Sequence, residues 1–446
     1  MKLADHPTVK AFHARAATDP APAAPTTLDA GGLRQLCQNA GADDIGLVEI
    51  SRDALDDQRE DILRFFPPTK TLISFVCRLN REPIRSPARS VANLEFHHAG
   101  DRVNEVAQRI VAALERQGVR AVNPAMGFPM EMDRFPEKLW VVSHKPVAVA
   151  AGLGHMGIHR NVIHPRFGNF ILLGTVLADA EATAYDRPLE YNPCVECKLC
   201  VAACPTGAIG PDGHFNFSAC YTHNYREFLG GFTDWVEQLA NSRNAADYRR
   251  RVSDPESASL WQSLSFGANY KAAYCLAVCP AGADVIGPYL TNKSGHVQAT
   301  VRPLQEKEET VYVVPGSDAE AHVARRFVNK NTKRVGNGLR PRSIRGFLRS
   351  LPLVFQRDRS EGLDAALHFT FRGDENQQAT VVIRDKTVRV SEGHVGSASL
   401  RVTADSRWWL SFLAKKRSLL WGLLVRRLRL KGSPRLLLAF GKCFPS

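Results

Sequence analysis

Four cysteines within eleven residues constrain this chain more than any other feature of its sequence. Cys194, Cys197, Cys200 and Cys204, directly followed by Pro205, spell C-x2-C-x2-C-x3-C-P. The two-residue gaps let three thiolates converge on one iron-sulfur cluster, while the fourth cysteine points at a second cluster. A structural zinc site would normally use two separated C-x2-C pairs. The spacing therefore predicts a loop folded around a 4Fe-4S cluster.

A second set of cysteines can supply the missing ligands. It consists of Cys220, Cys275 and Cys279, and the last of these is again followed by a proline. In two-cluster ferredoxins the ligand sets interlock. Cys279 would then complete the group formed by the first three cysteines of the motif, and Cys204 would join Cys220 and Cys275.

This makes seven cysteine ligands where two four-iron clusters need eight. The missing cysteine belongs at Ala272, because a full second motif would read C-x2-C-x3-C-P. Three alternatives follow for the second cluster. It is a 3Fe-4S cluster, it takes a non-cysteine ligand such as His223, or it leaves one iron open. An ordinary structural role for His223 is the competing interpretation.

The other three cysteines predict no disulfides. Cys77 lies in an apolar run and Cys37 in a helical pattern, so both are expected to be small buried hydrophobic residues, and Cys443 has no evident partner. Thiolates reserved for clusters imply a reducing compartment. The first residues lack the apolar core of a secretory signal, and no run of 18 apolar residues follows. We expect a cytoplasmic protein without a transmembrane segment.

Charge is distributed unevenly along the chain. Residues 321–446 contain 26 Lys and Arg against 8 Asp and Glu, a net charge of +18, whereas residues 1–320 carry −5. Such asymmetry predicts a polyanionic partner, either an anionic membrane surface or a nucleic acid such as tRNA. A solvated basic face that only aids solubility is the alternative.

The pattern of the sequence predicts an α/β N-terminal domain, a ferredoxin-like two-cluster iron-sulfur module and an α+β C-terminal domain, for which a resemblance given below implies the lipid-binding type. The expected parts are a disordered leader (1–30), an α/β cofactor domain (31–185), a ferredoxin-type iron-sulfur domain (186–292), a basic linker (293–345) and the C-terminal domain (346–446). Within the first domain, TLISFVCRL, KLWVVSHKP and FGNFILLGTVLAD are expected strands.

Three glycines between the last two of these strands are candidate cofactor-binding residues. Gly152, Gly154 and Gly157 formally make G-x-G-x-x-G, but they do not follow a strand, as a dinucleotide fingerprint requires. We expect a tight turn that lets backbone approach a planar cofactor or a cluster. His144 and Lys145 precede this turn and are candidate proton donors. Four histidines within residues 144–164 favour this segment as a wall of the active site.

The C-terminal domain is unusually apolar near its end. Trp408, Trp409, Phe412 and Trp421 lie among many leucines, which indicates either a packed core or a cavity for an apolar or acyl ligand.

The order of an α/β domain, A-G-L-G-x-x-G, CVECKLCVAACPTGAI, a lone cysteine and a final C-x3-C-P resembles the epoxyqueuosine reductase and reductive dehalogenase superfamily over residues 30–290. The resemblance implies a cobalamin over the α/β domain, reduced through two 4Fe-4S clusters. Residues 346–446 resemble the sterol carrier protein lipid-binding domain, which implies a five-stranded sheet with helices around an apolar tunnel.

Two departures separate the chain from this superfamily. Epoxyqueuosine reductases place an acidic proton donor in an F-V-D segment before the A-G-L-G helix, where this chain reads WVVSHKP. The second cluster motif also lacks its cysteine at Ala272.

Two functions remain open on the sequence. The first is an iron-sulfur reductase that receives electrons from a donor such as ferredoxin or flavodoxin and passes them through its clusters to an organic cofactor, with an apolar substrate. The second is a non-enzymatic electron-transfer or lipid-binding protein whose α/β domain holds no cofactor.

Overall fold

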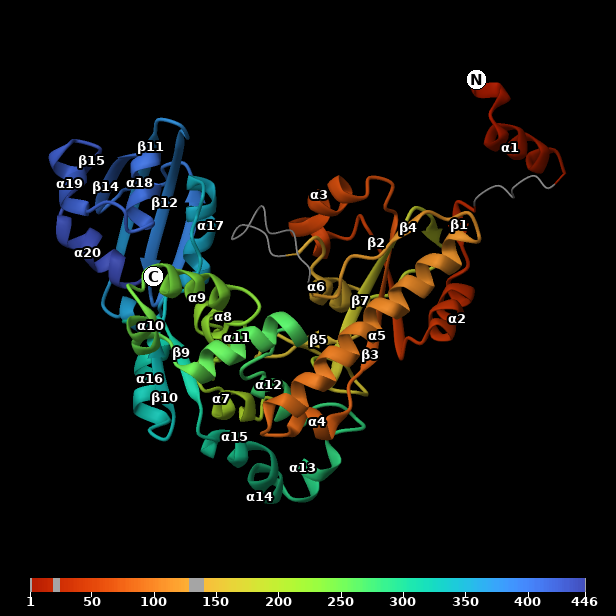
Figure 1. Cartoon of the computed structure of the whole chain (residues 1–446), viewed down its shortest axis with the longest axis horizontal. Helices are drawn as coiled ribbons and strands as arrows, with labels where there is room; N and C mark the ends of the chain where they lie inside the picture. The colour runs from red at the N-terminus through yellow and green to blue at the C-terminus, as the bar shows by residue number, and fades with distance from the viewer. Residues whose placement is uncertain (1, 19–24, 128–139, 446) are drawn as a thin grey trace.

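The computed structural model describes residues 2–18, 25–127 and 140–445. The chain forms an N-terminal domain and a C-terminal domain on opposite sides of a cysteine-bearing module (Figure 1).

The N-terminal domain is built on a four-stranded sheet in the order β2-β3-β7-β4, with every neighbouring pair antiparallel. The strands are β2 (Asp44–Glu49), β3 (Thr71–Arg78), β4 (Ala121–Val122) and β7 (Ile171–Ala178). Seven of the eight residues of β3 are buried, which explains its continuous apolar run, since a central strand covered on both faces needs no alternation.

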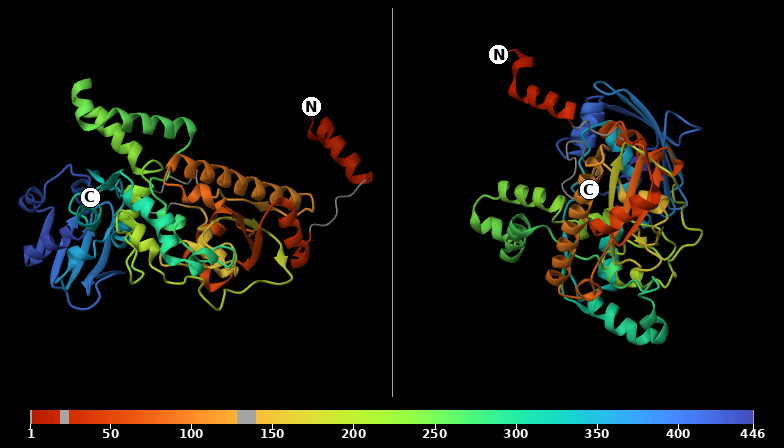
Figure 2. Two further views of the ribbon diagram at one scale, coloured as in Figure 1. Left: turned by 90° about the horizontal axis from the view of Figure 1, so that it is seen from below. Right: turned by 90° about the vertical axis from the view of Figure 1, so that its right-hand side faces the viewer.

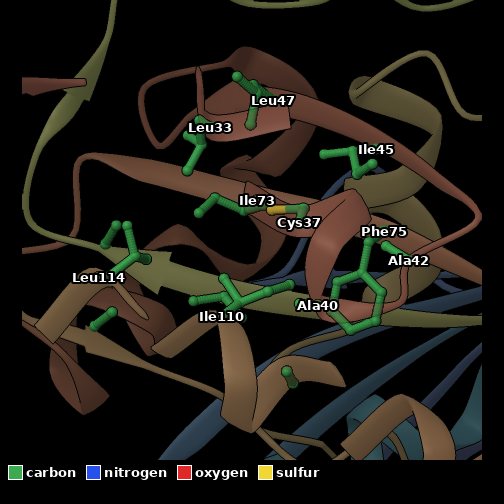
Figure 3. Close-up of a cluster of buried hydrophobic side chains, with 14 of the residues drawn as sticks. Leu33, Cys37, Ala40, Ala42, Ile45, Leu47, Ile73, Phe75, Ile110 and Leu114 are labelled. Carbon is green, nitrogen blue, oxygen red and sulfur yellow. The ribbon is translucent and has the colours of Figure 1, made fainter. Parts of the chain in front are cut away.

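Helices cover both faces of this sheet. On one face, α2 (Ala30–Ala40) and the long α5 (Arg89–Glu115) pack Leu33, Ile110 and Leu114 against sheet residues such as Ile73 and Phe75 (Figure 3). Cys37 and Cys77 lie buried in this core, as expected. On the other face lie α3 (Asp56–Phe65) and α6 (His144–Ala150), which contribute to a separate core. The expected α/β domain with a covered sheet is confirmed in this form.

The strand predicted at KLWVVSHKP is wrong for its described part. Residues 144–150 form α6, while residues 138–139 lie outside the described residues. Pro146 is tolerated because it occupies the first turn of the helix, where its missing N–H would have no partner. The two predicted strands on either side are confirmed as β3 and β7.

The cysteine-bearing module consists of short helices joined by loops. Its elements are α7 (Leu199–Ala203), α8 (Phe217–Asn224), α12 (Tyr274–Ala277), α13 (Gly287–Thr291), α14 (Lys293–His296), a π-helical turn (Val297–Val301) and α15 (Arg302–Glu306). Between α8 and α12, three helices form an insertion that projects from the body in Figure 2, namely α9 (Gly230–Ala240), α10 (Ala245–Arg251) and α11 (Asp254–Phe266).

The basic linker expected over residues 293–345 is instead an ordered part of the fold. After α15, the parallel strands β9 (Thr310–Val313) and β10 (Asn331–Arg334) are joined by α16 (Asp318–Arg326). Val311, Val323 and Phe327 form a small core against which Cys204 and Cys220 pack. The prediction failed because a few apolar residues, spread among many charged ones, suffice to cover one side of the module.

The leader also differs from its expectation. Residues 7–18 form α1 (Pro7–Thr18), none of whose residues is buried, and β1 (Thr27–Leu28) pairs with β8 (Glu181–Ala182). The Pro/Ala stretch at 19–24 lies outside the described residues.

The C-terminal domain has a five-stranded sheet in the order β13-β12-β11-β14-β15. Its strands are β11 (Ala365–Arg372), β12 (Gln377–Arg384), β13 (Thr387–Glu392), β14 (Leu400–Asp405) and β15 (Leu428–Gly432), and its helices are α17 (Ile344–Val354), α18 (Ser406–Leu413), α19 (Leu419–Leu424) and α20 (Pro434–Lys442). The only parallel pair is β11 with β14 among the described strands of this sheet.

Aromatic rings fill the interior between this sheet and its helices. Phe347, Phe369, Phe371, Trp409 and Phe440 lie with ring centroids 5.6 to 6.3 Å apart in their contacts across the core. These rings occupy the place where the resemblance implies an apolar tunnel. The apolar residues at 408–412 therefore act as core residues here, and an internal acyl ligand stays a prediction.

The C-terminal domain is joined directly to the cysteine-bearing module. Gln356 Oε1 accepts hydrogen bonds from Asn216 Nδ2 at 3.3 Å and from the backbone N–H of Asp318 at 2.9 Å. Tyr221 of α8 packs with Val354 of α17, and Arg357 forms an ion pair with Asp212. The helix that carries Cys220 is thus supported by the C-terminal domain.

The ordered segment 293–345 makes a direct prediction. Phe327→Ala should lower the free energy of unfolding by about 3–5 kcal/mol, because it removes a buried ring, and should reduce iron content by opening the core beside Cys204 and Cys220. Denaturant unfolding and iron analysis of anaerobically purified protein measure both effects.

The neighbouring Val328 is 87% exposed and gives a matched control, since Val328→Ala should change stability by less than about 0.5 kcal/mol. Equal, negligible effects of the two substitutions would mean that this segment is an unstructured linker after all.

Candidate iron-sulfur centre

The first three motif cysteines and Cys279 lie around one small pocket. Cys194, Cys197, Cys200 and Cys279 line it together with Ile158 and Ala281. Burial, followed by the neighbouring thiol groups, raises the pKa of Cys200, and burial likewise raises the pKa of Cys279 to about 12. The pKa of Cys200 responds to the other three thiols of this set, which means that the four thiols lie close together. The structure thus brings together the set that interlocking ligands predict.

A second group consists of Cys204, Cys220 and Cys275. Burial is the main cause of the raised pKa of Cys220, and Cys275 and Cys204 add to it. The pKa of Cys275 is raised to about 12 by burial and by Cys204. Cys275 also raises the pKa of Cys200, which indicates that the two groups of cysteines are neighbours.

The chain turns in the same way before both cysteine-bearing helices. Lys198, the residue after Cys197, has φ = 63° and immediately precedes α7, and Ala273, the residue after Ala272, has φ = 54° and immediately precedes α12. Left-handed backbone is uncommon for residues other than glycine, so its recurrence marks equivalent positions. Ala272 therefore occupies the place of Cys197 in the second motif. Its backbone N–H, like that of Ala273, donates to Asn224 Oδ1.

His223 lies one helical turn beyond Cys220 on α8 and is buried. Its Nδ1 accepts a hydrogen bond from the backbone N–H of Tyr312 at 3.4 Å, and its Nε2 is buried without a hydrogen-bond partner in the part of the chain that the structure describes. Burial lowers the pKa of His223 to about 4, so the imidazole is neutral near pH 7. A neutral imidazole is the form that binds metals, and a ligand role for His223 stays a prediction.

The two candidate proton donors differ sharply in their surroundings. His144 Nδ1 lies 2.9 Å from Thr175 Oγ1 and its Nε2 lies 3.0 Å from the carbonyl of Ala125. Burial lowers its pKa. Because both ring nitrogens are engaged, His144 fastens α6 to the sheet in this conformation.

Lys145, in contrast, is near the second cysteine group. Its Nζ donates to the carbonyl of Arg160 at 2.8 Å and to Asn161 Oδ1 at 2.9 Å. Asn161 Nδ2 in turn lies 3.8 Å from Cys275 Sγ. Burial lowers the pKa of Lys145, and Cys275 and Cys220 oppose that effect. One hydrogen-bonded residue thus separates an ammonium group from a cysteine of the second group.

The segment after α6 touches both cysteine groups. Ile158 and His159 line the pocket of the first group, while Asn161 reaches the second. Burial and the nearby Lys145 lower the pKa of His159 to about 4, and its Nε2 lies 3.2 Å from Asn169 Nδ2. Residues 158–161 thus pack beside both cysteine groups, and a role of residues 144–164 as a wall of the active site stays a prediction.

The three candidate glycines are packed by the protein itself. A Cβ at Gly152 would lie 2.5 Å from the carbonyl oxygen of Arg187, and one at Gly154 would lie 2.5 Å from that of Ile163. At Gly157 the nearest atom would be Ile163 Cδ1, at 2.7 Å. Close approach of the chain to itself accounts for glycine at these positions, and a cofactor-binding role stays a prediction.

Polar contacts to cysteine sulfur could not be predicted from the sequence, and one of them joins Thr206 Oγ1 to Cys204 Sγ at 3.6 Å. Besides Asn161, the backbone N–H of Ala208 donates to Cys204 Sγ at 3.3 Å. Within the described residues, no three His, Cys, Asp or Glu side chains are grouped so as to hold a single metal ion.

Comparison with known proteins agrees with this geometry. Residues 189–210 match the family described as 4Fe-4S binding domain. Epoxyqueuosine reductase of Cellulophaga algicola is 32% identical over 103 residues, which make up 21% of this chain and 33% of that protein. The corresponding Staphylococcus aureus protein is 38% identical over 80 residues, 18% of this chain and 20% of that protein. The chain thus spans a third or less of the length of these relatives.

Solved structures give a weaker likeness. Epoxyqueuosine reductase from Streptococcus thermophilus is 16% identical, with 61% of this chain and 74% of that chain covered and a TM-score of 0.35. The catabolic reductive dehalogenase NpRdhA is 14% identical over 66% of this chain and 37% of that chain, with a TM-score of 0.37. These scores are too low to transfer a domain arrangement. The chain carries a 4Fe-4S binding domain and resembles epoxyqueuosine reductases over part of its length.

The bonding of His144 predicts a structural role. His144→Ala should lower the free energy of unfolding by about 1–3 kcal/mol, because it leaves the buried carbonyl of Ala125 and the hydroxyl of Thr175 unpaired, yet leave iron content unchanged. Denaturant unfolding at a series of pH values measures the change.

The lowered pKa of His144 fixes the sign of the pH effect. Unfolding of the wild type takes up a proton as the pH falls below about 6.5, so its stability advantage over His144→Ala should shrink between about pH 7 and pH 5. An advantage that grows on acidification would contradict the buried, neutral state.

Proposed function

We propose that this chain is an iron-sulfur oxidoreductase with two clusters. Cys194, Cys197, Cys200 and Cys279 would hold a 4Fe-4S cluster, and Cys204, Cys220 and Cys275 would hold a second cluster of the 4Fe-4S or 3Fe-4S type. The observation that carries the proposal is that Cys194, Cys197, Cys200 and Cys279 line one small pocket, while Asn161 links Cys275 to Lys145. Such clusters supply one-electron transfer when bound.

The residues around the second group adjust its charge. Lys145 donates hydrogen bonds to the carbonyl of Arg160 and to Asn161 Oδ1 and, in its protonated form, places a positive charge near Cys220 and Cys275 that offsets the negative charge of their thiolates. Asn161 and the N–H of Ala208 direct hydrogen-bond donors at sulfur atoms. Charge and hydrogen bonds to sulfur both influence the reduction potential of iron-sulfur centres. Lys145 is also the better candidate proton donor, because His144 is held by two hydrogen bonds.

A corrinoid beside residues 144–168 is supported by the resemblance alone. Backbone carbonyls occupy the space beside Gly152 and Gly154 that a bulky cofactor would need. We therefore assign no reaction step to a corrinoid. Nor do we propose epoxyqueuosine as the substrate, since the stretch at 140–146 has no acidic residue. Ferredoxin or flavodoxin is the proposed class of electron donor.

A non-enzymatic electron-transfer protein is the second candidate. The packed glycines and the absent acid in WVVSHKP favour it. An absorption spectrum of anaerobically purified protein, with iron, sulfide and cobalt analysis, separates the two. Corrinoid bands and stoichiometric cobalt would favour the reductase, whereas clusters alone would favour the carrier. Absence of iron and sulfide after reconstitution would refute both.

Ligand substitutions test the two cysteine groups separately. Cys194→Ala should abolish the first cluster and destabilise the fold, because the free energy of cluster binding is also free energy of folding. Spin-resonance spectra of the wild type should show two unequal centres, one of them labile or of the three-iron type.

Ala272→Cys is the matched gain-of-ligand variant. It should raise the iron content and convert the second centre into a stable four-iron cluster, because Ala272 occupies a cysteine position. Two identical, stable clusters already present in the wild type would contradict the seven-ligand assignment.

Removal of the positive charge at Lys145 should make the second centre harder to reduce. Lys145→Met is expected to lower its reduction potential by on the order of 50 mV, equivalent to about 1 kcal/mol for one electron. A redox titration followed by spin resonance measures the shift, with Lys386→Met in the C-terminal domain as the control. An unchanged reduction potential would mean that the charge of Lys145 does not affect the second centre.

A further inference from the structure

One helix of the C-terminal domain presents large apolar side chains to solvent. On α19 and the residue after it, Leu420 is 73% exposed, Trp421 52%, Leu424 76% and Val425 40%. An exposed apolar cluster of this kind marks an interaction surface more often than scattered single residues do.

The opposite side of α19 holds the helix firmly in place. Leu419 and Leu423 pack against the domain core, and a Cβ at Gly422 would overlap the ring of Trp408, at 2.1 Å from Cζ2. Glycine at this position therefore allows the helix to lie directly on Trp408. The outward direction of the four exposed side chains is a fixed feature of the fold.

Basic residues surround this apolar cluster. Residues 406–446 contain ten Lys and Arg and no Asp or Glu. Arg417, Arg426 and Arg427 flank α19, and Arg429 and Lys431 lie on β15, the strand against which α19 packs; all five are exposed. Arg427 pairs with Asp405, whereas the other four have no ion pair within the described residues.

We propose that this surface, formed by Leu420, Trp421, Leu424 and Val425 with Arg417, Arg426, Arg429 and Lys431, docks on an anionic phospholipid bilayer. An apolar centre that enters the headgroup region, with cations at the level of the lipid phosphates, is the chemistry of interfacial membrane binding. This proposal goes beyond electron transfer, because it assigns the protein a membrane-binding surface.

The composition of the centre favours lipid over nucleic acid. Nucleic acids are bound by basic groups and by aromatic rings that stack on bases, whereas three of the four central residues are aliphatic. No helix among the described residues is long and apolar enough to cross a membrane, so the contact is made at the surface. α19 lies at the outer edge of the C-terminal domain, away from the N-terminal domain (Figure 1), and docking there would leave the cysteine module accessible to a redox partner.

Vesicle flotation of the full, cluster-loaded chain tests the proposal. Binding is expected to vesicles of phosphatidylglycerol mixed with phosphatidylcholine, and to be at least about tenfold weaker to pure phosphatidylcholine, since each basic residue near an anionic surface contributes roughly a fivefold gain in affinity. Raising the salt concentration should weaken binding to the mixed vesicles.

Two sets of variants separate the apolar and the charged contributions. The triple variant Leu420→Ser, Trp421→Ser, Leu424→Ser should weaken binding about tenfold or more, and the triple variant Arg426→Gln, Arg429→Gln, Lys431→Gln should remove most of the preference for anionic lipid. The matched control is Trp261→Ser with Leu264→Ser on α11, whose side chains are 59% and 65% exposed.

Retention of clusters and of the melting temperature shows that a variant has folded. If the triple serine variant fails this check, Trp421→Phe is used in its place. At equal amounts of bound protein, brominated lipid should quench the tryptophan fluorescence of the wild type more than that of Trp421→Phe. Equal affinity for both kinds of vesicle, loss of binding in the α11 control, or tRNA binding in place of vesicle binding would overturn the proposal. A dimer that masks α19 and binds no vesicles would do the same.

Discussion

The centre of this molecule depends on one constraint, which is that each of two loops contributes cysteines to both cysteine groups. The loop at 194–204 gives three thiols to the first group and one to the second, and the turn at 275–279 gives one thiol to each. Neither loop can move without disturbing both groups. The neighbouring elements, from the segment after α6 to the β9-α16-β10 unit, pack around this pair of loops.

The two groups are chemically unequal. The first has four thiols and is lined mainly by apolar and backbone atoms, whereas the second has three thiols and lies near Lys145 and Asn161. Four thiolates complete a four-iron cluster, while three leave one position open or empty. In the proposed assignment, the second cluster is therefore the one with a position left for a further ligand.

The cysteine grouping could be predicted from the sequence because it rests on short spacings. Gaps of two and three residues limit how far apart the thiols of one motif can lie, whereas the pairing of Cys279 with the first motif came from the interlocked ligand sets of two-cluster ferredoxins. The central strands β3 and β7 were also evident, since both are continuous apolar runs. In each case the decisive signal lies within a few residues.

Other features depend on contacts between distant segments. Asn161 reaches Cys275 across 114 positions of sequence, and neither residue's neighbours reveal this contact. Val311 opens the short apolar run 311–314, while Phe327 stands among charged residues, and only the fold shows that β9 and α16 bring the two together. The aromatic interior of the C-terminal domain likewise could not be told from a tunnel, because composition is the same whether rings fill a space or surround it.

The interlocked ligand sets also impose an order on biosynthesis. The first group remains one thiol short until Cys279 has been translated, and the second until Cys275 has. At least seventy residues lie between Cys204 and each of these two cysteines, including the whole of α9–α11. On the proposed ligand sets, neither cluster would reach its full coordination on the ribosome before this insertion has been made. The thiols of Cys194, Cys197 and Cys200 would wait for Cys279, and cluster delivery would be coupled to the late folding of α12.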